Sequence, residues 1–221
     1  TMTITHRALA FTLVSLTLAA CGGGGGGGDN GEQQAQTQFD IVSTPVLDGA
    51  TFGDNVQSQG RTDLEPVVGD GSFIIENGAF RFVCHYSFDI SQLPPGATVQ
   101  TATLSVFNRE TDGNPQGMMV LVRLDHVEYG DVFPQALLAA TGLDLNFGAI
   151  DDIGTTGRKN VDVTAQLQAD IDAGRPRSQY RLRGAVASNF DEIADVARLT
   201  DGEDSAGSGE LPHLIIEIES T

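Results

Sequence analysis

The chain contains no tryptophan, few other aromatic residues and little positive charge. Only 12 of its 221 residues are lysine or arginine, against 30 aspartate and glutamate residues, and the formal net charge is −18. Such a surface repels phosphate polyanions, so nucleic-acid binding is disfavoured. The absence of tryptophan removes the flat ring that sugar-binding platforms commonly use. High acidity is also typical of good solubility, of a saline habitat or of bound divalent cations.

A hydrophobic run long enough to cross a membrane is missing as well. The apolar stretch of residues 8–20 is shorter than the ~20 residues that a spanning helix needs, and Thr12, Ser15 and Thr17 interrupt it. It follows the basic residue Arg7. This order is typical of a secretion signal that is removed from the mature protein.

The stretch ends in Leu18-Ala-Ala-Cys21, which matches the lipobox of bacterial lipoproteins. We expect the Cys21 thiol to carry a diacylglycerol and to attach the protein to a membrane. The alternative is an ordinary signal peptide with a chance cysteine. Because Gly22 rather than aspartate follows the cysteine, the sorting rules of Gram-negative lipoproteins favour the outer membrane.

Composition divides the chain into three parts. Residues 1–20 form the expected lipoprotein signal peptide. Residues 21–38 combine the lipidated cysteine with a glycine-rich and glutamine-rich tether that cannot bury enough apolar surface to fold. Residues 39–221 are sufficient for one hydrophobic core and form a single expected domain.

A strand with one strongly apolar face is predicted from residue 79 to residue 90. Aromatic and sulfur-containing residues occupy every second position: Phe80, Phe82, Cys84, Tyr86 and Phe88. With Cys21 used by the lipid, Cys84 has no partner for an intramolecular disulfide, and we expect a buried thiol. His85 and Arg81 lie on the opposite face, where a solvated histidine or a surface-binding histidine is expected.

Further segments alternate in the same way. Strands are predicted over residues 98–108, 118–127, 179–186 and 213–219, with a loop-rich stretch before residue 159. Over 159–174 the period changes, because Val163, Leu167 and Ile171 are four residues apart and Gly174 supplies a stop. The predicted fold is all-β, an antiparallel jelly-roll-like β-sandwich with one short helix.

The order of the short motifs resembles that of the DNRLRE-type extracellular jelly-roll domains. Residues 88–104 carry the pattern FD-x-S-x-L-P-x-G-A-x-V-x-x-A-x-L, and 162–164 read Asp-Val-Thr before the helix. Residues 180–183 read Tyr-Arg-Leu-Arg, and 212–214 read Pro-His-Leu after a late acidic loop. In the first motif, Asp89 and Ser91 are suited to bond backbone groups of the following turn.

The resemblance implies a carbohydrate-binding or adhesive module, since some members of the group are classed with binders of acidic polysaccharides such as alginate. In a chain without tryptophan, His85 and Tyr129 are the remaining candidates for contact with a sugar. The expected partners are a polysaccharide and the membrane.

The acidic loop of residues 200–210 suggests a calcium site as an alternative to a plain solvated loop. Its carboxylates are Asp201, Glu203 and Asp204, and Asp48 and Asp54 are candidates to join them from the other end of the chain. Ca²⁺ takes six to eight oxygen ligands. The spacing differs from that of an EF-hand loop.

Sequence motifs of the common enzyme classes are missing. The chain has no G-x-S-x-G, no H-E-x-x-H and no phosphate-binding loop, and its four histidines are scattered. We therefore expect a non-catalytic, extracytoplasmic lipoprotein that binds an extracellular polymer or acts in adhesion. The alternatives are an assembly lipoprotein that binds another envelope protein and a polysaccharide-degrading enzyme.

Overall fold

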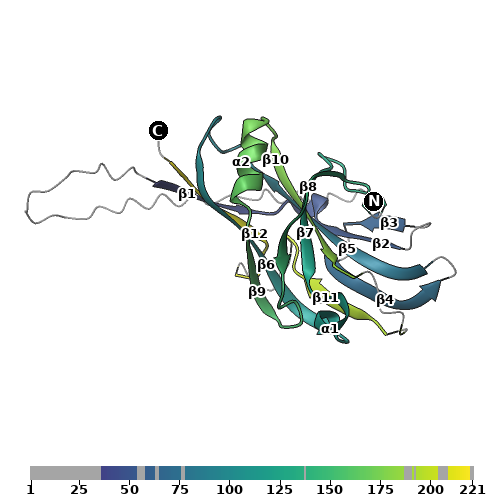
Figure 1. Ribbon diagram of the computed structural model, residues 1–221. Helices are drawn as coiled ribbons and strands as arrows, with labels where there is room; N and C mark the ends of the chain where they lie inside the picture. The colour runs from purple at the N-terminus through teal and green to yellow at the C-terminus, as the bar shows by residue number, and fades with distance from the viewer. Residues whose placement is uncertain are drawn as a thin grey trace, which may run out of the picture.

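The computed structural model describes residues 36–53, 58–62, 65–75, 78–136, 138–186, 191, 193–203 and 209–219, with the side chains of 58, 72–75 and 78–80 left aside. The expected signal peptide, Cys21 and most of the tether lie outside these residues. The structure is mostly antiparallel β-sheet and confirms the sandwich-like all-β fold (Figure 1).

The elements follow one another along the chain in this order: β1 (Gln36–Val42), the 3₁₀ turn η1 (Pro45–Leu47), β2 (Gly49–Gly53), β3 (Ser58–Arg61), β4 (Val67–Ile75), β5 (Gly78–Asp89), β6 (Val99–Asp112), α1 (Pro115–Met119), β7 (Val122–Glu128), β8 (Thr141–Ile150), β9 (Gly157–Asp162), α2 (Thr164–Asp172), β10 (Arg177–Gly184), β11 (Asp195–Leu199) and β12 (His213–Glu219).

The strands form two packed layers joined by hydrogen bonds. One layer runs β1-β12-β6-β11-β4, and β9 pairs with the other edge of β6. The second layer runs β3-β2-β5-β10-β7-β8. Strand β4 also pairs with the start of β5, which links both layers into a single 12-stranded sheet. All of these pairs are antiparallel.

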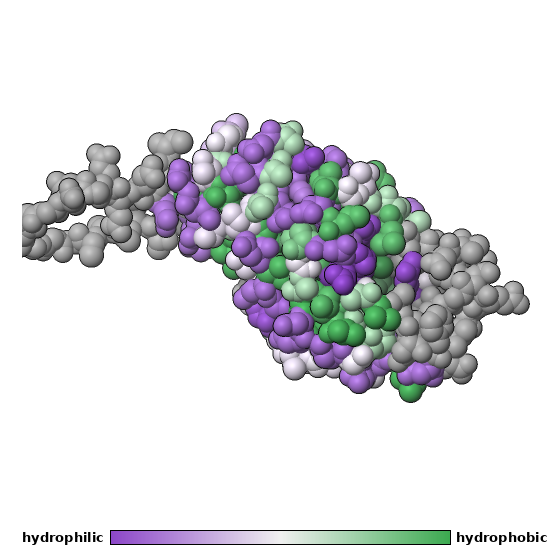
Figure 2. Space-filling model, viewed as in Figure 1, coloured by the Kyte–Doolittle hydropathy of each residue, from purple (hydrophilic) through white to green (hydrophobic). Residues whose placement is uncertain are grey.

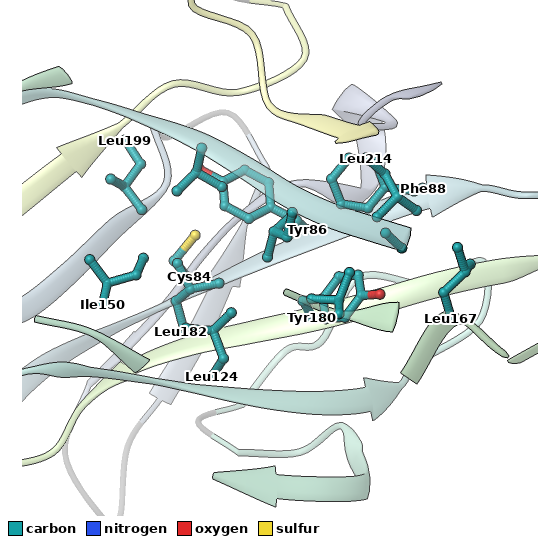
Figure 3. Packing of buried hydrophobic residues seen from close by; sticks show 14 of the residues in the cluster. Cys84, Tyr86, Phe88, Leu124, Ile150, Leu167, Tyr180, Leu182, Leu199 and Leu214 are labelled. Carbon is teal, nitrogen blue, oxygen red and sulfur yellow. The ribbon is translucent and has the colours of Figure 1, made fainter. Parts of the chain in front are cut away.

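The core lies between the layers and follows the predicted alternation. Cys84, Tyr86 and Phe88 of β5 are fully buried and point into it (Figure 3). Leu182 of β10 and Leu214 of β12 pack in the same cluster. Phe82 is half-buried at its margin, and the side chain of Phe80 lies outside the described residues. The Cys84 thiol is free and buried, as expected.

The predicted helix is α2, and it is attached to β6. Val163 and Leu167 are buried, and Gly174 ends the helix with a left-handed φ of 65°. The Gln168 side chain accepts a hydrogen bond from the Val99 amide at 2.8 Å. In the first motif, Asp89 Oδ1 accepts a hydrogen bond from the Ser91 amide at 3.0 Å, which is the local turn contact that the sequence suggests.

Three stretches differ from the predictions. Residues 159–162, expected at the start of the helix, form the end of β9 and pair with β6. The strand expected from residue 118 begins at Val122, because Pro115 and the capping Asn114 side chain start the short helix α1. The loop-rich stretch before residue 159 contains β8, an edge strand that pairs only with β7 and exposes most of its residues. The sequence of β8 contains glycines and Asn146, which has a left-handed backbone conformation. Both residue types are uncommon in strands, so the sequence of β8 does not resemble that of a typical strand.

Leu182→Ala is expected to lower the free energy of unfolding by about 2–5 kcal/mol, because it opens a cavity in a fully buried part of the core. The control is Leu145→Ala on β8, where the side chain is 53% exposed and the change is expected to stay within about 0.5 kcal/mol. Denaturant unfolding of both variants measures the difference. Equal losses would contradict the placement of Leu182 in the core.

Candidate functional site

The second layer has an outer face, turned away from the core, which carries the residues between those that point inward. His85 lies on this face, as its position in the strand predicts, but the expectation that it is solvated is wrong. It is fully buried, because the segment after β7, residues 129–136, covers it. The Tyr129 and Phe133 rings contact the imidazole edge-on, with centroids 5.8 and 5.6 Å away.

The covering segment is held by hydrogen bonds from β10. Gln179 Oε1 accepts from the Tyr129 and Gly130 amides at 2.8 and 3.0 Å, and its Nε2 donates to the Gly130 carbonyl at 2.7 Å. The Tyr129 hydroxyl donates to the Leu47 carbonyl at 3.0 Å. The structure thus brings His85 and Tyr129 together as packing groups, and a sugar contact by either residue stays a prediction.

The imidazole of His85 is neutral. Burial lowers its pKa to about 3, and the charge of Arg181 acts in the same direction, while Asp125 opposes both. The ring bonds to the Thr51 hydroxyl at 3.1 Å through Nε2. A buried, uncharged histidine of this kind contributes packing and one hydrogen bond.

Below the surface of the outer face, Asp125 binds two arginines of β10. Arg181 and Arg183 each donate to Asp125 Oδ2, at 2.9 and 2.8 Å, and the Asn146 amide donates to Oδ1 at 2.8 Å. Burial alone raises the pKa of Asp125, but the hydrogen bonds from Arg183, Asn146 and Arg181 more than offset it, so the pKa lies below its usual value. This carboxylate stays charged at neutral pH.

Three arginines of neighbouring strands form what we call the arginine row: Arg81 of β5, Arg183 of β10 and Arg123 of β7. Arg123 lies directly opposite Arg183 in the register of the two strands. Burial and the charge of Arg183 together lower the pKa of Arg81. Like charges in direct cross-strand positions are destabilising. In a chain with only 12 basic residues, their gathering on one face is unexpected for packing alone.

Arg123 has the least compensated charge of the row. It is half-buried, and its side chain makes no hydrogen bond or ion pair among the residues that the structure describes. Arg183 also donates to the Asn146 side chain at 2.5 Å, so its guanidinium is already held in place. One carboxylate, Asp125, therefore faces Arg181 and Arg183, while Arg123 is left with a free set of donors.

A small cleft opens beside the row. Its volume is about 100 Å³, which accommodates a group the size of a few water molecules. Arg81 and Arg183 supply its polar lining, Val83 belongs to its floor, and Leu138 and Val186 form an exposed apolar rim. On the face of the molecule shown in Figure 2, hydrophilic residues surround small groups of apolar ones.

The residues of the expected calcium site fall into three groups. Asp48 and Asp201 lie close enough for the charge of Asp201 to act on Asp48. Glu203 is exposed, and Asp54 and Asp204 lie outside the described residues. Within the described ranges, no set of three or more histidine, cysteine or acidic side chains has metal-binding geometry.

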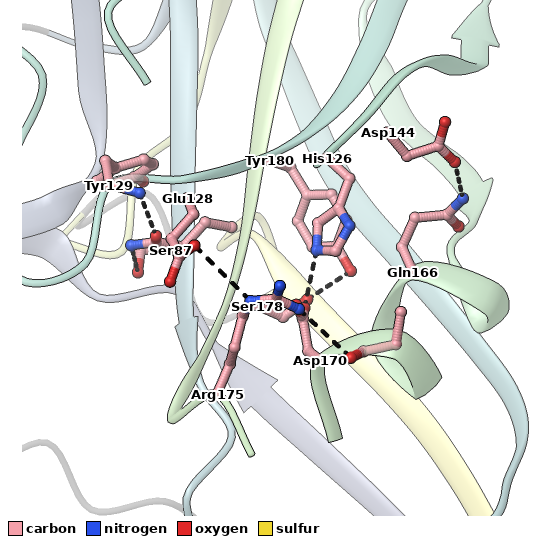
Figure 4. Close-up of polar contacts among 12 residues, drawn as sticks. Ser87, His126, Glu128, Tyr129, Asp144, Gln166, Asp170, Arg175, Ser178 and Tyr180 are labelled. Carbon is pink, nitrogen blue, oxygen red and sulfur yellow. Dashed lines mark hydrogen bonds and ion pairs between the residues drawn. The ribbon is translucent and has the colours of Figure 1, made fainter. Parts of the chain in front are cut away.

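A separate polar cluster lies at the end of the core (Figure 4). His126 Nε2 and Asp170 Oδ2 are 2.9 Å apart, and Asp170 Oδ1 accepts from Arg175 at 3.2 Å. The Tyr180 ring lies beside the imidazole, with centroids 5.8 Å apart. The contact between His126 and Asp170 joins β7 to α2. Both side chains are buried, so a substrate has no access to them.

Comparison with known proteins adds no relative: no protein-family model and no curated protein matches the chain. The resemblance to DNRLRE-type domains therefore stays a prediction. In the described part of the chain, no helix combines the length and the apolar character needed to cross a bilayer.

The sequence did not reveal the arginine row. The alternation of apolar residues shows on which face of a strand a side chain lies, but it does not show which strand lies beside it. Arg81, Arg181 and Arg183 all occupy outward positions that the strand patterns indicate. Only the pairing of β10 with β7 brings Arg123 opposite Arg183. The scarcity of basic residues in an acidic chain is the signal that would have drawn attention to them.

His85→Gln is expected to make stability less dependent on pH between 7 and 5. Below about pH 6.5 the imidazole is protonated in the unfolded chain, whereas in the folded chain it is protonated only near pH 3. As the pH falls below about 6.5, this group therefore lowers the free energy of unfolding of the native chain by about 1.4 kcal/mol per pH unit. Denaturant unfolding at several pH values measures the slope. An unchanged slope would show that His85 titrates normally in the folded state.

Proposed function

We propose that the protein is an extracytoplasmic lipoprotein whose sandwich binds an acidic extracellular polysaccharide through the arginine row. The observation that carries the proposal is the direct cross-strand pair of Arg123 and Arg183, in which Arg123 has no partner among the described residues. A like-charged pair costs stability, and a bound anion would remove that cost.

The chemistry of the site suits a carboxylate on a sugar ring. Guanidinium groups bind carboxylates through two parallel hydrogen bonds, and this geometry favours arginine over lysine. The cleft of about 100 Å³ has room for such a group rather than for a whole sugar. The apolar rim of Leu138 and Val186 would contact the C–H face of the ring. The polymer would then lie across the outer face.

The strong negative charge of the rest of the chain shapes how such binding works. A polyanion is repelled at a distance by a net charge of −18 and is attracted only beside the row. Each contact is therefore weak, and several contacts along one polymer, made by many anchored copies, would give retention. The interaction should weaken as salt screens the arginines.

The position of the anchor supports the same proposal. The expected tether leads into β1, and β1 lies at the opposite end of the molecule from the β4–β5 hairpin (Figure 1). Arg81 and Gly69, which line the cleft, lie close to that hairpin. A protein held at β1 would thus present the cleft away from the membrane. The polyglycine segment of residues 22–28 would allow it to reach a polymer.

Arg123→Gln is expected to weaken retention of the full chain on alginate by about tenfold, since it removes one charge-assisted contact. The control is Arg198→Gln in the other layer, where the side chain already binds Asp112 at 2.7 Å. Affinity electrophoresis in alginate and in a neutral glucan measures both variants. Equal retention of the native chain in the two polymers would rule out a specific acidic ligand. No retention of the native chain in either polymer would rule out polysaccharide binding.

Cys21→Ser is expected to move the protein from the membrane fraction to the soluble extracytoplasmic fraction, because it removes the lipid attachment point. Fractionation and metabolic labelling with a fatty acid report the outcome. A labelled or membrane-bound Cys21→Ser protein would refute lipidation at this residue.

A further inference from the structure

Among the strands that the structure describes, β1, β3, β8 and β9 pair along one edge only. Natural sheets protect such edges from pairing with another chain by keeping them short, charged, irregular or covered. Strand β3 has four residues, and β9 carries the basic residues Arg158 and Lys159. Strand β8 contains the left-handed Asn146 and two register shifts against β7. Each of these three edges is therefore unsuited to receive a further strand.

Strand β1 lacks these protections. Its seven residues pair with β12 in one continuous register, from Gln36 opposite Glu219 to Val42 opposite His213. The strand contains no proline, no glycine and no basic residue. Its one charged side chain, Asp40, contacts His213 Nδ1 at 2.6 Å. In a chain with a net charge of −18, this edge therefore repels a second copy less than a typical stretch of the surface does.

The geometry of the β1–β12 ladder shows which backbone groups face the open edge. The Ser43 amide donates to the Pro212 carbonyl at 3.2 Å, which continues the register of the ladder by one residue. Hydrogen-bonded and non-hydrogen-bonded positions alternate along an antiparallel ladder. Every second residue before Ser43 therefore directs its N–H and C=O groups toward β12. The residues that direct these groups toward the open edge are Gln36, Gln38, Asp40 and Val42.

A second copy of β1 fits this edge when the two strands run antiparallel about a two-fold axis at Phe39. This arrangement overlaps all seven residues of the strand and places Gln38 of each copy opposite Asp40 of the other. Both residues direct backbone groups toward the edge, so each such pair exchanges two hydrogen bonds. The Gln38 side-chain amide is also a donor for the Asp40 carboxylate. An axis at Asp40 would instead bring two carboxylates together, which is unfavourable.

Phe39 adds an apolar contact to the same pairing. Its ring packs against the core and is only partly buried in the single chain. At the two-fold axis, the two Phe39 residues occupy a non-hydrogen-bonded position, where opposed side chains approach most closely. Aromatic pairs across two strands stabilise a sheet. At the end of the ladder, Val42, which is 37% exposed, would be covered by Gln36 of the second copy.

We propose that β1 is a dimerisation edge, at which two copies of the chain join their first layers into one continuous sheet. Both copies use the same strand, so the pairing closes on itself and gives a dimer rather than a filament. The proposal rests on the edge of β1 and does not depend on the proposed function. Because β1 lies at the opposite end of the molecule from the β4–β5 hairpin, the second copy leaves the cleft beside the arginine row open (Figure 1).

Sedimentation equilibrium of the Cys21→Ser chain, which is expected to lack the lipid, tests the dimer. We expect a dissociation constant of about 1–100 µM, as for a small interface. Gln38→Pro removes an N–H group that faces the open edge and not β12, so it should raise this constant about tenfold or more and leave the monomer folded.

Gln38→Asn keeps both the N–H group and the side-chain amide, and it is the matched control. Its dissociation constant should stay within about threefold of that of the parent chain. A parent chain that is monomeric at every concentration up to about 1 mM would overturn the proposal. So would a Gln38→Pro chain that dimerises as well as the parent.

Cysteine cross-linking tests the register without a proline in the strand. Opposed residues of a hydrogen-bonded pair have Cα atoms about 5.5 Å apart, which a disulfide can span. In the Cys21→Ser background, a mixture of Gln38→Cys and Asp40→Cys chains should form a covalent dimer under mild oxidation, and either chain alone should form little. Cys84 is buried and does not compete.

Leu145→Cys, on the exposed edge strand β8, is the control for random collision. It should cross-link poorly with both of the β1 cysteine chains. Efficient cross-linking of Leu145→Cys with either chain would show that the β1 contact is unspecific. Preferential linking of Gln38→Cys to itself would contradict the two-fold axis at Phe39.

Discussion

Strand β5 carries hydrogen bonds along both of its edges, and the rest of the structure is arranged around it. One edge pairs with β2, and the other pairs first with β4 and then with β10. The strand thus belongs to the second layer and also joins it to the first. Its inward face supplies Cys84, Tyr86 and Phe88 to the core, and its outward face supplies Arg81, His85 and Ser87. Because a strand alternates strictly, a shift by one residue would exchange these two sets completely.

This constraint explains how much of the structure can be predicted from the sequence. Strands β5, β6, β10 and β12 have clear alternation because one face of each supplies apolar side chains to the core, and α2 has a clear four-residue spacing. Strand β8 is different, because an edge strand exposed on most of its length has no apolar face to reveal it. The sandwich could therefore be predicted, while its edges could not.

The candidate sites were less predictable, for two physical reasons. The burial of His85 depends on residues 129–136, which cover it and whose packing over β5 leaves no periodic pattern in the sequence. The arginine row depends on the register of β10 against β7, which sets Arg123 opposite Arg183. The acidic residues at both ends of the chain suggested a meeting, and Asp48 and Asp201 do approach each other.

The position of β1 also determines how the domain would bear force. Strand β1 pairs antiparallel with β12 from Gln36 opposite Glu219 to Val42 opposite His213. If the tether is fixed in a membrane and the cleft holds a polymer, the load enters at Gln36 and runs along the strand. The hydrogen bonds of the β1–β12 ladder are then sheared together rather than opened one after another. Resistance to such a pull is set by the rate of unfolding rather than by equilibrium stability. The edge of the sandwich nearest the anchor would act as its mechanical clamp.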